Sequence, residues 1–402
     1  MTARRAGLVA LLAASLISTL GSMMSLVAIP WLVLTTTGSP ADMGLIVAAG
    51  TVPYLASSVF GTPLADRIGM RATAITADTV SALATAAIAI SPDIGLPTIA
   101  AMVGISGLVR GVGDRTKHVL LRPAAEQAGA PMPRVTSLYD GLTNVATLAG
   151  APVGGLIVFW VGPQGAVLVD AMSFAASAVL VAVLTRPGLE PQAAADPERY
   201  LPALLAGTRQ LGRDRLLLIM VGTIFFANVV NQATGSVFVP LWVSEELHSP
   251  AALGLVFGAV SAGAVLGNLV FTALAVKLSR YVVFAVGMLI SGAPRVLVLG
   301  VSDQLAVVLT VSFLCGVAVS AVNPIFGATL YQRVPDEFQT RVFGLVAAIC
   351  YAGFPIGGAL GGLAVAAFGL HTAILLAGGL YLLATLVPLL RYRASRTRCA
   401  PD

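Results

Sequence analysis

Charged residues are scarce in this 402-residue chain: Asp, Glu, Lys and Arg make up 10% of it, against about 25% in a soluble domain. Hydrophobic residues make up 57%, and the mean hydropathy is +0.92. So few charges exclude an ordinary water-soluble globular protein. The composition predicts a membrane protein that crosses the bilayer many times.

Cysteine is equally scarce, with 3 residues scattered through the chain, so we expect neither a disulfide framework nor a cysteine-based metal site. The polar segments are too short to fold a catalytic domain, and no nucleotide-binding loop or nucleophile arrangement can be recognised. We therefore expect no enzyme, no cofactor and no metal. The net charge of +5 follows from where the basic residues lie along the chain, and it does not indicate nucleic-acid binding.

Apolar runs of about 20 residues, the length that crosses a bilayer as a helix, recur along the chain. The first run is longer than the apolar core of a signal peptide, so it is expected to stay in the protein. We predict one membrane helix for each of twelve runs, which are Leu8–Leu34, Ala41–Ala65, Ala72–Ile90, Leu96–Lys117, Val135–Val161, Gly165–Thr185, Leu216–Val243, Ala251–Val276, Tyr281–Gly300, Leu305–Tyr331, Val342–Phe368 and His371–Leu390.

The basic residues indicate how these helices are oriented. If the N-terminus is cytoplasmic and the helices alternate, every Lys and Arg except Arg110 and Arg295 falls in a cytoplasmic segment. The outer loops carry acidic residues instead. This distribution follows the positive-inside rule, and it predicts a multi-pass protein of the cell membrane with both termini cytoplasmic.

The two halves of the chain repeat one another. Ser39-Pro40-Ala41 recurs as Ser249-Pro250-Ala251, and Gly150-x-Pro152-x-Gly154-Gly155 recurs from Gly353 to Gly358. A polar, proline-rich stretch, residues 186–215, separates an N-terminal half (1–185) from a C-terminal half (216–402) that ends in a short basic tail. We predict an all-α membrane fold of twelve transmembrane helices in two parallel six-helix pseudo-repeats, with substrate bound between them near the midplane.

Polar faces without charge occur on the first helix of each half. We expect a substrate cavity lined by Ser18, Ser22, Met23, Asn228, Asn231 and Gln232. The alternative is that these side chains only hydrogen-bond neighbouring helices.

Charges inside membrane helices are candidates for proton coupling because they are costly in hydrocarbon. Arg110 and Asp114 share one helical face, so Asp114 can pair with Arg110, and Asp78 is a second acid that could titrate. The alternative for each is a structural pair or an interfacial position. Asp140 and Asp170 lie near the ends of predicted runs, and we expect them to pair or to lie at the interface.

A short charged hairpin follows the second apolar run. Its residues Leu64, Ala65, Asp66, Arg67, Gly69 and Arg71, with Gly61 just before them, resemble the loop between helices 2 and 3 of the major facilitator superfamily. The resemblance implies a cytoplasmic gate. Asp66 would meet the start of helix 11, and its paired arginine would reach Asp114, which would latch the outward-facing state.

Other motifs narrow the resemblance. Gly150, Pro152, Gly154 and Gly155 are similar to the helix 5 motif of the superfamily's exporters, although close packing alone also requires such glycines. The segments Ile29–Leu32 and Gln332–Glu337 resemble the macrolide-efflux and enterobactin-exporter-like branch. That branch often has Gly-Asp midway along helix 1, whereas this chain has Gly21-Ser22.

The resemblance implies a monomeric exporter of a small hydrophobic or amphiphilic compound, an antibiotic or a natural product, driven by proton antiport. Its expected partners are that compound and the lipid bilayer, with no nucleic acid. Two alternatives share the fold: a uniporter or importer of a small solute, and a membrane sensor or assembly partner that transports nothing.

Overall fold

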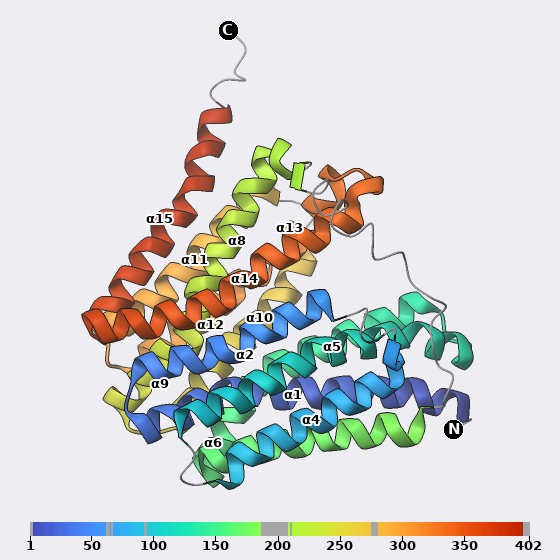
Figure 1. Ribbon diagram of the computed structural model, residues 1–402. Helices are drawn as coiled ribbons and strands as arrows, with labels where there is room; N and C mark the ends of the chain where they lie inside the picture. Colours follow the sequence, from blue (N-terminus) through green and yellow to red (C-terminus); the bar gives the residue numbers. More distant parts are fainter. Residues whose placement is uncertain are drawn as a thin grey trace. The chain divides into compact units, whose positions relative to one another are not determined.

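The computed structural model describes residues 3–61, 65, 67–91, 95–185, 208–209, 211–274 and 280–396. Over these residues the chain forms helices and no strand (Figure 1). It divides into two compact units, Met1–Pro197 with His248–Gly254, and Glu198–Leu247 with Leu255–Asp402. Most of the predicted linker, residues 186–215, lies outside the described residues.

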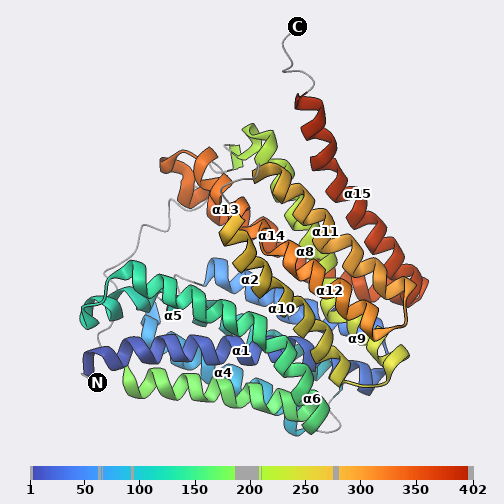
Figure 2. The ribbon, with the colours of Figure 1, turned by 180° about the vertical axis from the view of Figure 1, so that it is seen from behind.

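The first unit is built on α1, α4, α5 and α6, which pack against one another, while α2 packs on α5 and α1 (Figures 1 and 2). Gly162 interrupts α6 with a φ of 77°, a left-handed conformation that glycine adopts without strain. This break falls between two predicted runs, so the 53-residue α6 carries two spans. The helices are α1 (Ala3–Thr37), α2 (Pro40–Phe60), α4 (Met70–Ile90), α5 (Leu96–Ala128) and α6 (Met132–Leu184).

The second unit packs α8 against α14 and α15, and α11 against α12 and α15 (Figures 1 and 2). Two π-helical segments, η2 and η3, interrupt the span that begins with α8. The elements are α8 (Arg215–Ala233), η2 (Thr234–Phe238), α9 (Val239–Trp242), η3 (Val243–Leu247), α10 (Ala251–Leu274), α11 (Arg280–Val301), α12 (Leu305–Val319), α13 (Val322–Arg333), α14 (Asp336–Phe368) and α15 (Leu370–Arg396).

The count of membrane spans agrees with the twelve predicted runs. Within the described residues, 10 helices are long and apolar enough to cross a bilayer. One of them is α6, which holds two spans, and the apolar part of α15, Leu370–Leu386, supplies the remaining one. The expectation of an all-α, multi-pass membrane protein is confirmed.

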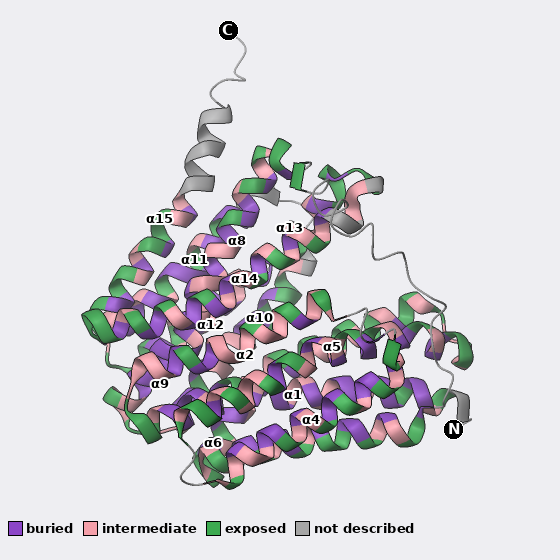
Figure 3. Ribbon diagram, viewed as in Figure 1, coloured by how far each residue is buried: buried purple, intermediate pink, exposed green. Residues whose placement is uncertain are grey.

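Each helix buries one side and exposes another (Figure 3). The core of the first unit includes Leu11, Ala74, Leu120 and Val181, all 0% exposed. The exposed sides carry large apolar residues such as Leu83 and Val183. Apolar residues on the outer surface of a helical unit are expected where lipid, and not water, surrounds it.

Asp214 fixes the start of α8. Its carboxylate accepts hydrogen bonds from the backbone amides of Leu216 (3.0 Å) and Leu217 (3.2 Å) and from Arg333 Nε (2.6 Å). Burial alone would raise the pKa of Asp214, but these hydrogen bonds outweigh it and hold the pKa below its ordinary value of 3.8. Asp214 also lines a cavity of about 450 Å³ with Arg213, Arg215 and Arg333.

We expect Asp214→Ala to lower the free energy of unfolding by about 1 kcal/mol at pH 7, because it removes an N-cap. A carboxylate with a depressed pKa stabilises the fold above its unfolded pKa, about 3.9, and loses that contribution as pH falls through the folded value. The difference from wild type should therefore shrink in acid. Thermal unfolding in detergent at pH 7 and at about pH 3 measures it, and Asp214→Asn keeps the cap without the charge. A pH-independent difference would contradict the account.

Candidate functional site

A buried cation lies at the centre of the first unit. Lys117 on α5 is 1% exposed, and its Nζ donates hydrogen bonds to Asp78 Oδ1 on α4 and to Ser18 Oγ on α1, each at 3.0 Å. It also lies 3.3 Å from Asp114 Oδ1. Ser177 on α6 donates to Asp78 Oδ2 at 2.6 Å. These five residues, which we call the Lys117 cluster, join four helices.

The ion pairs of the Lys117 cluster differ from the pair expected from sequence, which joined Asp114 to Arg110. Asp114 forms its ion pair with Lys117, three residues away on the same helix, and not with Arg110. It also accepts a hydrogen bond from the Tyr54 hydroxyl at 3.4 Å. Lys117 was missed because the predicted run ends there, whereas α5 continues to Ala128. The sequence did contain one signal: Lys117 follows Asp114 by three residues, a spacing that lets the two side chains pair on one helical face.

Arg110 lies one turn before Asp114 on α5, against aromatic rings. Its Cζ is 5.5 Å from the centre of the Tyr54 ring and 5.4 Å from that of Phe174. Both distances are within cation–π range. Its Nε is buried and has no hydrogen-bond partner among the described residues.

Asp170 on α6 is a second buried acid, and the expectation of an interfacial position is wrong. It is 2% exposed and accepts hydrogen bonds from Ser25 on α1 and from Ser173, the latter at 3.2 Å. Gly21 of α1 lies so close that an added Cβ would collide with Asp170 and Ser173. Asp140, the other acid expected near a helix end, is exposed. We call Asp170, Ser25 and Ser173 the Asp170 cluster.

The residues expected to line a cavity in the first unit are largely buried. Ser18 accepts from Lys117, and Ser22 donates to the backbone carbonyl of Ser18 at 2.6 Å. Met23 is half-buried, and its Cβ faces Gly150 on α6. In this structure the two serines therefore form hydrogen bonds within α1 and to α5, which is the alternative that the sequence left open. A substrate contact by these residues stays a prediction.

In the second unit, one of the three carboxamides on the span that begins with α8 bonds to a neighbouring helix. Asn228 donates to the backbone carbonyl of Cys350 on α14 at 2.9 Å. Asn231 and Gln232 are half-buried. Their role in binding a substrate likewise stays a prediction.

The charged hairpin is described only in part. Gly61 ends α2, and its amide donates to the carbonyl of Ser57 at 2.8 Å. Gly69 begins α4 with a φ of 96°. Arg71 donates to Thr185 Oγ1 (3.0 Å) and to the carbonyl of Ala182 (2.5 Å) at the end of α6.

Two members of the hairpin bear on the expected latch. Arg67 is exposed, and the carboxylate that an arginine of the hairpin was expected to reach, Asp114, is paired with Lys117. Asp66 lies outside the described residues, so its contact with helix 11 stays a prediction.

The helix 5 motif lies where α6 approaches α1. A Cβ on Gly150 would meet Met23 and the carbonyl of Leu20, and one on Gly154 would lie 2.8 Å from Met24 Cα. Pro152 and Gly155 lie on the same turns of α6, which stays helical across the proline. The copy of the motif in the second unit packs in the same way: Gly353 and Gly357 lie against the backbone of α8.

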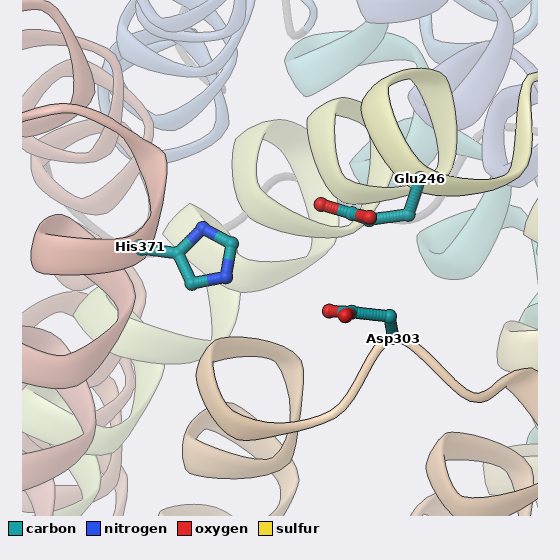
Figure 4. A group of neighbouring side chains, drawn as sticks. All are labelled: Glu246, Asp303 and His371. Carbon is teal, nitrogen blue, oxygen red and sulfur yellow. The ribbon is translucent and has the colours of Figure 1, made fainter.

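Three side chains that could bind a metal gather in the second unit. Glu246 of η3, Asp303 before α12 and His371 of α15 bring ligand atoms within 4.8 Å of one another (Figure 4). All three residues are exposed. Exposed acidic groups often lie together without an ion, so we assign no metal to these three residues.

Comparisons with known proteins indicate that this chain is a transporter. The family model described as "Transmembrane secretion effector" matches residues 4–399. The multidrug efflux pump Tap of Mycolicibacterium fortuitum is 26% identical over 379 residues, 92% of each chain. The pump of that name from Mycobacterium tuberculosis is 25% identical over 372 residues, 91% of this chain and 88% of the relative. The human chromaffin granule amine transporter is 26% identical over 84% of this chain and 62% of its own.

Solved structures show the same fold. The nucleoside transporter NupG superimposes with a TM-score of 0.81 at 11% identity, over 98% of this chain and 99% of its own. A bacterial homologue of the human lysosomal transporter Spinster gives 0.72 at 14% identity, over 97% and 95%. The family match over nearly the whole chain identifies a transporter and not an enzyme. The chain therefore belongs to the transmembrane secretion effector family of the major facilitator superfamily.

Proposed function

We propose that this protein exports a small hydrophobic or amphiphilic compound, an antibiotic or a natural product, in exchange for protons. Two six-helix halves would expose a midplane site to each side of the membrane in turn. Export is supported by the multidrug efflux pumps that match over most of both chains. The helix 5 motif, which resembles that of the superfamily's exporters, points in the same direction.

The Lys117 cluster is the observation that carries the proton-coupling part of the proposal. Two carboxylates, Asp78 and Asp114, face one ammonium group, so the cluster has one negative charge in excess when both acids are ionised. A net charge held between membrane helices is costly, and one proton cancels it. Proton uptake and release at this cluster would then change how tightly α1, α4, α5 and α6 are held together.

The proposed protein acts as a monomer in the cell membrane, with both termini cytoplasmic. It needs no cofactor besides the proton gradient. The match to amine transporters makes cationic amphiphiles the first compounds to test.

Proteoliposomes that hold the purified protein and a trapped pH dye test the proposal. Addition of a substrate from a panel of hydrophobic antibiotics and amines should produce a pH change, because protons leave as substrate enters. Asp114→Asn should abolish the pH change, since it removes the excess negative charge while Lys117 keeps its pair with Asp78. Arg122→Gln, an exposed change on the same helix that breaks only a surface pair with Glu126, is the matched control.

Other outcomes separate the alternatives. Substrate flux without any pH change would overturn antiport and favour a uniporter or importer. Ligand binding without flux, measured on the same vesicles, would favour a sensor or assembly partner.

A further inference from the structure

Asp170 is an acid for which the structure supplies no paired cation. Its carboxylate is fully enclosed, and both of its hydrogen-bond donors are neutral serine hydroxyls. Among the described residues, no Lys, Arg or His nitrogen lies within the 4.0 Å that defines an ion pair with it. An ionised carboxylate in such a setting is unfavourable unless a cation approaches or a proton binds.

Arg110 is the matching cation, and among the described residues it forms no ion pair. It attracts Asp170 electrostatically, yet it lies against the rings of Tyr54 and Phe174 with its buried Nε unbonded. Phe174 follows Asp170 by four residues on α6, which is about 6 Å along the helix axis. Arg110 therefore packs against α6 about one helical turn away from Asp170.

The other charged groups of the neighbouring helices are engaged elsewhere. On α4, Asp78 is bound by Lys117 and Ser177, and Arg71 donates to the end of α6. On α5, Asp114 pairs with Lys117, while Arg115 and His118 are exposed. Beside Asp170, α1 offers only Ser25 and the close backbone of Gly21. Arg110 is thus the one charged partner that the described residues offer to Asp170.

We propose that Asp170 is a second proton-binding site, separate from the Lys117 cluster, at which a proton and the guanidinium of Arg110 compete for the carboxylate. With the proton bound, Asp170 is neutral and Arg110 rests on Tyr54 and Phe174, as in this structure. When the proton leaves to water, Arg110 moves from the rings to the carboxylate and replaces it. The proposal rests on the proton coupling proposed above, to which it adds an acid on the sixth span.

Asp170→Asn tests the proposal in the full-length protein. An amide imitates the protonated acid and still accepts the serine hydroxyls, so the variant should fold. It should retain exchange of substrate for substrate across the vesicle membrane but lose uphill export driven by a pH gradient. Asp140→Asn, an exposed acid on the same helix, should retain both. Uphill export by Asp170→Asn at the wild-type rate would overturn the proposal.

A second measurement needs no substrate. Infrared spectra of the purified protein should contain C=O absorption of protonated carboxylic acids at neutral pH. Asp170→Asn should lose the component of that band that belongs to Asp170, and Asp140→Asn should retain it. Arg110→Gln should move the loss of the band to higher pH, because the competing cation is gone. Identical bands in wild type and Asp170→Asn would overturn the proposal. If wild type moves no protons with substrate, the proposed function fails, while this readout still shows whether Asp170 holds a proton.

Discussion

Replacing Lys117 with methionine should leave little folded protein. The change removes the ammonium group that compensates Asp78, whose carboxylate then keeps only the hydroxyl of Ser177. Breaking one side of a buried ion pair costs about 3–5 kcal/mol. That is a large part of the total stability of a typical domain, about 5–15 kcal/mol. The yield of monodisperse protein and its unfolding temperature in detergent measure the effect.

Two further variants show whether charge is the cause. The double variant Lys117→Met with Asp78→Asn leaves only Asp114 without its cation, and the Asp114 side chain is 35% exposed. The variant should therefore recover most of the lost stability, although it should not couple protons to transport. Arg115→Met, which removes an exposed charge two residues away, should behave as wild type. A Lys117→Met protein as stable as wild type would show that the buried pair contributes little to the fold.

The fold could be predicted from the sequence because each membrane span is recognisable from its own residues. An apolar run of the right length identifies a helix without any knowledge of its neighbours. Even the break inside α6 was foreseen, since polar and glycine residues around Gly162 separate two runs. The basic residues then constrain the number of spans.

The partners within the candidate site could not be predicted in the same way. Asp78, Asp114 and Arg110 were identified as unusual charges, but a helical face shows only which side chains point together and not which helix they meet. Lys117 was placed at a helix end because the apolar run stops there. Beyond it, α5 continues with buried Leu120 and Leu121 among polar residues, an amphipathic pattern that a search for fully apolar runs overlooks.

Asp170 was misjudged for a related reason. It lies close to the start of the predicted run at Gly165, which suggested a position near the membrane surface. The helical segment instead begins just after Gly162, so Asp170 lies eight residues, or about 12 Å, inside it. Its burial also depends on Gly21, whose missing side chain allows α1 to approach.

The serine face of α1 links the two buried clusters. Ser18 accepts from Lys117, and Ser25 donates to Asp170. These serines are seven residues apart, or about 10 Å along one face of the helix. A change of protonation at either cluster would alter a hydrogen bond to the same helix. The polar residues of α1 thus connect the two proposed proton sites through hydrogen bonds to one helix.

Gly154 of the helix 5 motif should tolerate substitution far less than Gly141, another glycine of α6. Gly154→Leu would place a branched side chain where even a Cβ lies 2.8 Å from Met24 Cα and 3.0 Å from its carbonyl. These neighbours are backbone atoms, which cannot move aside as the end of a flexible side chain can. The added side chain would therefore push α1 and α6 apart. Overpacking of this kind costs about 1–3 kcal/mol, and separation would also disturb both buried clusters. We expect a lower unfolding temperature in detergent and a loss of transport.

Gly141→Leu on the same helix provides the control, because a Cβ at Gly141 meets nothing within 4 Å. There the replacement of glycine should be neutral or stabilising, by up to about 1 kcal/mol, since leucine favours a helix more than glycine does. Transport measured per folded molecule then separates the two interpretations of the motif. If Gly154→Leu folds as stably as wild type and still fails to transport, the glycine serves the transport cycle and not packing. If it folds and transports as wild type, the close approach of α1 and α6 in this structure is not required.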